Sequence, residues 1–261
     1  MLKMSVLAIF LILLVSSYAA GLLGSLTGLG GGVVVIPVLT LGFGVDFHYA
    51  VGAALVASMA TSSGSGAAYV KEGITNVRLG MFLEIATTIG AVCGAWVAVY
   101  FNNATIAVIY GFVLVLTAVM QMTRKKEVPY VKGVKYDIRN KAGGFSVMYV
   151  AGALSGILGI GSGVLKVIAM DNIMKVPFKV STTTSNFMMG VTACASAVVY
   201  IQRGNILPEL ACPVLIGVLL GALTGARMLQ KFDVRLLRKI FVVAVLMVAA
   251  NMIYMGFTGK F

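Results

Sequence analysis

The sequence predicts an all-α integral membrane protein, a polytopic helical bundle of about eight spans built from two repeated halves. Hydrophobic residues make up 60% of its 261 residues and charged residues only 11%, whereas soluble domains average about 25% charged residues. The apolar residues form runs of about 20, the length of helix that crosses a bilayer. A glycine-rich segment of the first half also recurs in the second half.

The apolar runs are too long and too continuous for the strands of a membrane barrel, so we expect helices. The first run continues without a polar break, which favours a membrane helix over a cleaved signal peptide. A glycine-rich stretch with a short apolar piece, 28–43, follows this first run. Spans are expected at about 5–27, 48–70, 77–101, 104–123, 143–165, 178–201, 205–226 and 236–258.

A polar segment, 124–141, divides a first membrane repeat, 1–123, from a second membrane repeat, 142–261. The segment is rich in Lys and Arg, so the positive-inside rule predicts a basic cytoplasmic loop. The same rule assigns 227–239 to the cytoplasm, whereas eight simple spans place it outside. Either one apolar segment does not cross fully, or the rule fails there.

The net charge of +12 does not indicate a nucleic-acid partner, because the basic residues lie in short gaps between apolar runs and meet anionic lipid there. The three cysteines have no metal-ligand spacing and the methionines are scattered, so no metal or other cofactor is expected. The sequence has one histidine, His48, and no HExxH motif. We therefore do not expect an enzyme.

The glycine-rich segment is part of an internal repeat. Residues 21–33 align with 152–164, and the same offset of 131 positions brings Tyr69 onto Tyr200 without a gap. Each half therefore has an apolar helix, a Gly-x-Gly-x-Gly break, a short piece and further helices. Duplicated halves with matched broken segments are typical of secondary transporters, whose sites lie near the midplane at the repeat interface.

The glycine breaks are predicted to bind a small anion. A break frees backbone groups that are costly in lipid unless they line a cavity or meet a ligand, and glycine lets a ligand approach them. Exposed N–H groups at a helix start bind anions. The alternative, close helix packing, is favoured for the runs 90–94 and 217–225 instead. The predicted anion-binding residues of the breaks are Gly28, Gly30, Gly31, Gly32, Gly159, Gly161, Ser162 and Gly163.

Five polar side chains extend this predicted site. Lys166 lies in an apolar run, so it either faces a wet interior and binds the anion or extends to a membrane interface. Thr184 and Ser185 start the next helix, where hydroxyls either bind an oxyanion or hold helices together. Ser58 and Ser62 lie on one helix face and either line the site or pack.

Glu84 is the candidate for ion coupling. It sits between apolar residues of the expected span 77–101, and a carboxylate inside a membrane is typical of proton relays. Its distance from Arg78 is under two helical turns. It therefore lies either in the membrane interior or close to the membrane surface.

The sequence resembles the TauE/SafE sulfite exporter family, also described as the TSUP family. The resemblance rests on 24–39, on its repeat 156–163, on the Thr184–Ser185 pair and on 217–227, and it covers nearly the whole chain. It implies export or import of sulfite, sulfonates or related sulfur-containing anions through a membrane domain of this size. The chain departs from the pattern where Ile168 takes the place of a proline matching Pro37, and where Ala53–Ala54 match Thr184–Ser185.

We therefore expect a secondary transporter of a small anion, in particular sulfite, a sulfonate or another sulfur-containing oxyanion. The alternatives are a non-transporting membrane subunit or a carrier of a small carboxylate. The expected partners are the anionic substrate and the lipid bilayer, with proton or sodium coupling open. The expected location is the cell membrane, with multiple passes. Transport direction and oligomeric state stay open.

Overall fold

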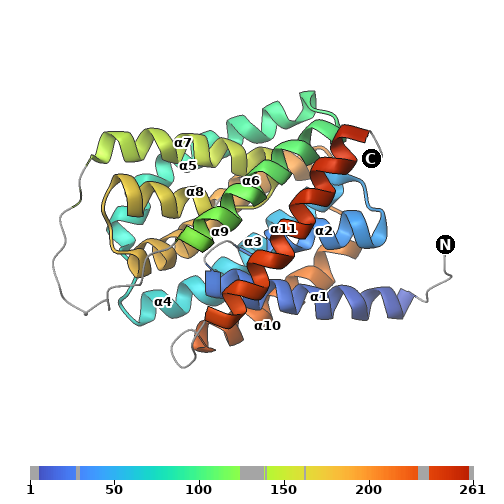
Figure 1. Cartoon of the computed structure of the whole chain (residues 1–261), viewed down its shortest axis with the longest axis horizontal. Helices are drawn as coiled ribbons and strands as arrows, with labels where there is room; N and C mark the ends of the chain where they lie inside the picture. Colours follow the sequence, from blue (N-terminus) through green and yellow to red (C-terminus); the bar gives the residue numbers. More distant parts are fainter. Residues whose placement is uncertain are drawn as a thin grey trace.

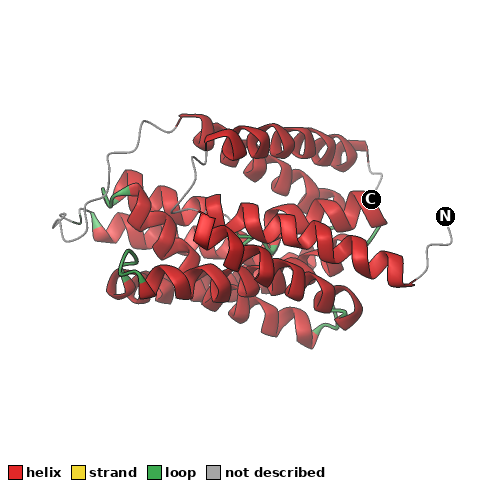
Figure 2. Cartoon of the chain, turned by 90° about the horizontal axis from the view of Figure 1, so that it is seen from below, coloured by secondary structure: helices red, strands yellow, loops and turns green. Residues whose placement is uncertain are grey.

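The computed structural model describes residues 6–27, 30–123, 138, 140–161, 163–228 and 235–258. Throughout these ranges the chain is helical apart from short connections, and it forms no strand (Figure 2). The helices run roughly along one axis of an elongated bundle (Figure 1). The all-α prediction is confirmed. Most of the predicted basic loop 124–141 lies outside the described residues.

The first half contains one long helix, a short helix after the glycine break, and three further long helical segments. Its helices are α1 (Val6–Thr27), α2 (Gly32–Pro37) with a π-helical turn (Val38–Gly42), α3 (Phe47–Thr61) joined by a second π-helical turn (Ser62–Gly66) to α4 (Ala67–Lys71), α5 (Val77–Val97) with a 3-10 turn (Ala98–Tyr100), and α6 (Asn103–Thr123).

The second half repeats this order. Its helices are α7 (Lys141–Leu158), α8 (Gly163–Ile168) with a π-helical turn (Ala169–Ile173), α9 (Phe178–Gln202), α10 (Pro208–Met228) and α11 (Arg235–Thr258).

One predicted span boundary is wrong. The expected span 143–165 ends early, because α7 stops at Leu158 and Val164 already belongs to α8. Gly159 adopts a left-handed φ of 69°, a conformation that ends helices and that glycine adopts without strain. The apolar residues continue past this turn, so hydropathy alone did not reveal it.

Each glycine break reverses the chain. After α1, α2 runs back toward the end of the bundle at which α1 begins (Figure 1), and Gly24 packs against the Gly30–Gly31 backbone. After α7, the π-helical turn that follows α8 returns to the start of α7, where Gly144 packs against Met174. The two hairpins therefore enter the bundle from opposite ends.

The backbone confirms the repeat in detail. The segments α2 and α8 and the π-helical turns after them begin and end at positions 131 residues apart. Residues with a left-handed φ recur at the same offset. The pairs are Gly30 (81°) with Gly161 (63°), Gly44 (65°) with Lys175 (56°), and Gly73 (70°) with Gly204 (71°).

The two halves cross at glycine-lined contacts. A Cβ atom on Gly221 of α10 would overlap the carbonyl oxygen of Tyr18 in α1, and one on Gly94 of α5 would overlap that of Ala153 in α7. The broken helix of each half therefore packs on an unbroken helix of the other half. This confirms the predicted packing role of the 90–94 and 217–225 glycines, which let helix backbones approach closely.

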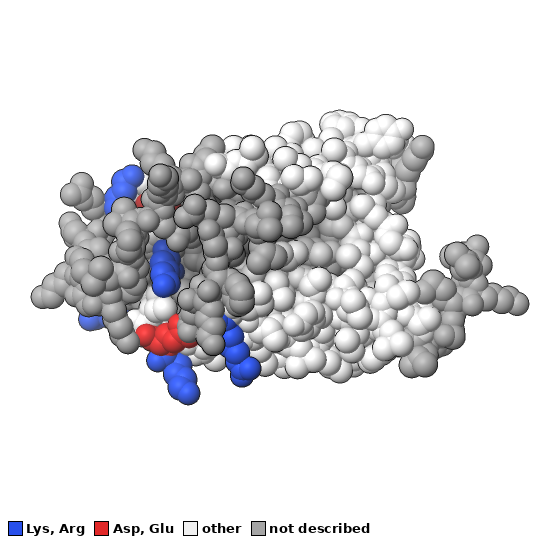
Figure 3. Space-filling model, turned by 60° about the horizontal axis from the view of Figure 1, so that its bottom comes forward, with Lys and Arg blue, Asp and Glu red and all other residues white. Residues whose placement is uncertain are grey.

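Basic side chains gather at one end of the bundle (Figure 3). Lys71 ends α4, Lys141 begins α7 and Arg227 lies in the last turn of α10. At the opposite end, Arg203 donates to the Ala95 carbonyl oxygen over 2.8 Å. Because each glycine break reverses the chain, α10 ends and α11 begins at this basic end, where α7 also begins.

The close contact of α1 with α10 leads to a stability prediction. Gly221→Ala should destabilise the protein by about 1–3 kcal/mol, because the new methyl group forces the helices apart. Gly42→Ala is the matched control, since a Cβ there meets nothing within 4 Å. Thermal unfolding in detergent measures both. Equal unfolding midpoints for the two variants would contradict the close contact.

Candidate functional site

The two glycine turns meet inside the bundle. A Cβ atom on Gly32 would lie 3.0 Å from the carbonyl oxygen of Gly159. The side chain of Met189, near the middle of α9, lies against both Gly30 and Gly161. The structure thus brings the two predicted breaks together, in a closed arrangement. Gly28 and Ser162 lie outside the described residues.

Ser58 lies where the two turns meet. Its Oγ is 3.6, 3.1 and 3.3 Å from the Cβ positions of Gly30, Gly32 and Gly161, respectively. The side chain is 0% exposed, and its hydroxyl has no hydrogen-bond partner among the residues that the structure describes. A buried polar atom without a partner costs free energy. Such an atom between two glycine turns fits a site that a polar ligand completes.

Thr61 holds the first turn. Its Oγ1 accepts the Gly31 N–H at 3.0 Å and donates to the Ala57 carbonyl at 2.9 Å. The N–H groups of Val34 and Val35 donate to the Gly31 carbonyl. Both backbone polar groups of Gly31 are therefore bound, the N–H by α3 and the carbonyl by α2.

The second turn is held in a similar way. Ser185 of α9 donates to the carbonyl oxygen of Gly163 over 3.1 Å, which places this predicted site residue at the start of α8. Thr184 instead accepts the Asn76 N–H at 3.1 Å, in the connection at the basic end. The structure therefore brings Ser185 to the turn but does not bring Thr184 there.

Two tyrosines related by the repeat bind the ends of the broken helices. The Tyr69 hydroxyl donates to the Ser25 carbonyl at 3.3 Å, and the Tyr200 hydroxyl donates to the Gly156 carbonyl at 3.2 Å. The donors and the acceptors are each 131 positions apart. Each half therefore ties the last turn of its broken helix to its own central helix.

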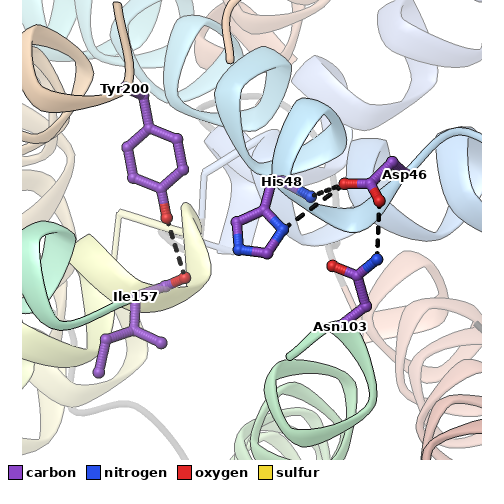
Figure 4. A network of polar contacts seen from close by, with 5 residues as sticks. All are labelled: Asp46, His48, Asn103, Ile157 and Tyr200. Atoms are coloured by element: carbon purple, nitrogen blue, oxygen red, sulfur yellow. Dashed lines mark hydrogen bonds and ion pairs between the residues drawn. The ribbon is translucent and has the colours of Figure 1, made fainter. Parts of the chain in front are cut away.

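Figure 4 shows the Tyr200 hydroxyl on the carbonyl oxygen of Ile157, at 3.3 Å, and a separate polar group at the connection before α3. Asp46 caps α3 by accepting the His48 N–H at 2.9 Å, and its other oxygen accepts the Asn103 side-chain amide at 2.7 Å. Asn103 begins α6. This group joins α3 to α6 at the end opposite the basic residues.

Ser62 belongs to a separate groove of about 660 Å³ between α3–α4 and α9. The π-helical turn that starts at Ser62 widens the helix, and Ser62 donates to the Phe187 carbonyl at 3.1 Å. Ser58 and Ser62, which were predicted to lie on one helix face, therefore point to different places. Ser58 faces the turns, while Ser62 faces the groove. The groove residues are Met59, Ser62, Ser63, Ala67, Val70, Lys71, Phe187, Gly190 and Val191.

Lys166 and Glu84 are joined through Thr192. The Lys166 ammonium donates to the Thr192 Oγ1 at 2.5 Å, and this hydroxyl donates to Glu84 Oε1 at 2.6 Å. Lys166 is 0% exposed and Glu84 is 7% exposed. Both side chains are therefore packed inside the bundle, and Lys166 does not extend out of it. Within the described part of the chain, Glu84 Oε2 has no hydrogen-bond partner.

This polar network exists on one side of the repeat only. The 131-residue offset places Val35 opposite Lys166, and the offset of 127 that aligns Gly90 with Gly217 places Ala211 opposite Glu84. Both mates are buried and apolar. Thr192 was not among the predicted site residues, although the offset pairs it with Thr61, the hydroxyl that binds Gly31 of the first break.

Comparisons with known proteins agree with the membrane fold. The family described as sulfite exporter TauE/SafE matches residues 13–252. "Probable membrane transporter protein YunE" of Bacillus subtilis (strain 168) is 29% identical over 95% of this chain and 98% of its own length. "Probable membrane transporter protein YdhB" of the same organism is 27% identical over 83% and 89%. No solved structure matches.

The second turn leads to a prediction about packing. Gly161→Ala should destabilise the protein by about 1–2 kcal/mol, because an L side chain is strained at its φ of 63°. The methyl group also overlaps Met189. Adding Met189→Ala to Gly161→Ala should remove the overlap but not the strain. A double-mutant cycle of thermal unfolding checks this, and fully additive effects would contradict the contact.

Proposed function

Because the chain belongs to the TauE/SafE sulfite exporter family, we propose that this membrane transporter carries a small anion, either sulfite, a sulfonate or another sulfur-containing oxyanion, by a secondary mechanism. One observation carries the proposal: two glycine turns, one from each half, meet around the partnerless hydroxyl of Ser58. Neither the family nor the relatives' names set the substrate. The chemistry of this meeting point favours an anion.

The two glycine turns offer hydrogen-bond donors to a ligand and carry little negative charge. Each glycine turn is followed by a short helix, α2 or α8. The start of a helix presents N–H groups and the positive end of the helix dipole. The Ser58 hydroxyl adds a donor, and Lys166 lies in the last turn of the short helix α8, one turn after Gly163. A sulfur oxyanion has several acceptor oxygens in one compact group, which suits convergent donors of this kind.

The opposed hairpins support alternating access. The α1–α2 hairpin enters from one end and the α7–α8 hairpin from the other, so motion of either hairpin opens the meeting point to a different side. Met189 closes the space in the present conformation. Opening requires its side chain to move, and methionine changes rotamer easily.

A non-transporting subunit and a small-carboxylate carrier are the alternative functions. A subunit without a ligand needs no donor left unpaired between two turns. A carboxylate has two oxygens in one plane and engages fewer convergent donors than a sulfur oxyanion. Both considerations favour the proposed function.

Counterflow in proteoliposomes tests the proposal. Vesicles preloaded with unlabelled sulfite or methanesulfonate should take up the labelled anion, and Ser58→Ala should lower the apparent affinity about 5–10-fold through loss of one hydrogen bond of about 1–1.4 kcal/mol. Ser146→Ala is the matched control, because Ser146 is bonded within α7 at the basic end. Absence of counterflow with either anion would refute the proposed substrate class.

We also propose that the basic end faces the cytoplasm of a cell membrane, as the positive-inside rule indicates. Glu209 and Arg227 are exposed at opposite ends of α10. In a variant without native cysteines, Glu209→Cys should react with an impermeant maleimide in intact cells, and Arg227→Cys should react only after lysis. The reverse pattern would overturn the assignment.

A further inference from the structure

We propose that Lys166, Thr192 and Glu84 couple the movement of the anion to a proton. In this mechanism, which rests on the proposed anion transport, the entering anion replaces the Glu84 carboxylate as the counter-charge of the Lys166 ammonium, and Glu84 then binds one proton. The anion and the proton cross together and leave together.

The geometry places this network at a junction of the two halves. Glu84 lies on α5 of the first half, while Lys166 and Thr192 lie on α8 and α9 of the second half. All three side chains are buried, and the contact runs from ammonium to hydroxyl to carboxylate. In the described part of the chain, no direct ion pair joins Lys166 to Glu84. A rearrangement of α8 therefore separates the charges by breaking one hydrogen bond.

Charge balance requires the exchange. A buried ammonium without a counter-charge costs several kcal/mol, even after the protein relaxes around it. With Lys166 charged and Glu84 ionised, the pair is neutral overall. A monovalent anion that binds nearby adds one negative charge, and protonation of Glu84 removes one. The neutral sum is restored only when the anion and the proton are bound together.

Glu84 has a free atom for this proton. Its Oε1 accepts from Thr192 and from Thr88, at 2.6 and 3.3 Å, whereas its buried Oε2 has no partner. The carboxylate takes up a proton from water at Oε2 to become a carboxylic acid, and it returns the proton to water when the anion leaves. No other bond forms or breaks, and no oxidation or reduction takes place.

Lys166 belongs to the short helix that begins at the second glycine turn. It lies one turn after Gly163, and Ser185 binds the carbonyl of Gly163. The contacts of Glu84 run to Thr88, to Thr192 and through Thr192 to Lys166. Further titratable groups on α5 and on the elements packed around it are Arg78, Cys93, Lys141, Tyr149, Asp171, Lys179, Cys194 and Tyr200.

The repeat sets the stoichiometry. Val35 and Ala211 occupy the positions that correspond to Lys166 and Glu84, and neither can carry charge. The chain therefore has one such charge exchange and not two. The inference predicts one proton for each monovalent anion and no net charge moved across the membrane.

Accumulation of methanesulfonate in proteoliposomes tests the coupling, because a sulfonate stays a monovalent anion at all working pH values. An inward proton gradient of one pH unit should drive about tenfold accumulation, since one unit equals about 1.4 kcal/mol. An imposed membrane potential should leave this accumulation unchanged. A response to the potential without a response to the proton gradient would overturn the inference.

Glu84→Gln separates coupling from transport. The variant mimics the protonated acid, so counterflow should persist while accumulation driven by the proton gradient falls to onefold. Glu209→Gln, at an exposed carboxylate of α10, should keep the tenfold accumulation. Full accumulation by Glu84→Gln would overturn the inference.

Thr192 variants and the wild-type protein complete the test. Thr192→Val should reduce the accumulation, whereas Thr192→Ser should retain it by keeping the hydroxyl. If Glu84→Gln does not fold, the proton flux of the wild-type protein decides, because any ratio other than one proton per methanesulfonate contradicts the inference. Loss of wild-type counterflow with both sulfite and methanesulfonate would instead contradict the proposed function.

Discussion

The backbone groups freed at the two glycine breaks set the main constraint on this fold. Inside a membrane these groups find no water, so each must be bound by the protein or by a ligand. Tyr69 and Tyr200 bind the last carbonyls of α1 and α7, and Thr61 binds the first N–H after one break. The central helices α3–α4 and α9 therefore supply the hydroxyls that make both hairpins stable.

The glycines of α5 and α10 meet a second requirement. A hairpin whose backbone is bound from one side still needs close packing on the other, and side chains larger than hydrogen would keep the helices apart. Gly94 and Gly221 let these helices touch the broken helices of the opposite half. Close approach and hydroxyl binding together hold the turns at the centre, where a partnerless serine and a buried charged network lie near them.

The sequence predicted much of this arrangement, because its signals are local or periodic. Run length predicted the helices, and the repeat predicted one glycine break in each half. The offset between like segments does not say which segments touch, so the crossing of α1 onto α10 could not be predicted. The position of Lys166 was open for a similar reason, since only the packing of α9 brings Thr192 to its ammonium. The signal for Thr192 was present in its repeat mate, Thr61.

The crossed packing also has a consequence for biosynthesis. The ribosome delivers α1 and its glycine turn long before α10, so the N-terminal hairpin enters the translocon without the surface it needs. Its contact with α10 can form only after most of the polypeptide has been made. The α5–α7 contact forms much sooner, because little chain separates its partners. The α1–α10 contact is therefore among the last to form, together with the contact of α11 on α6.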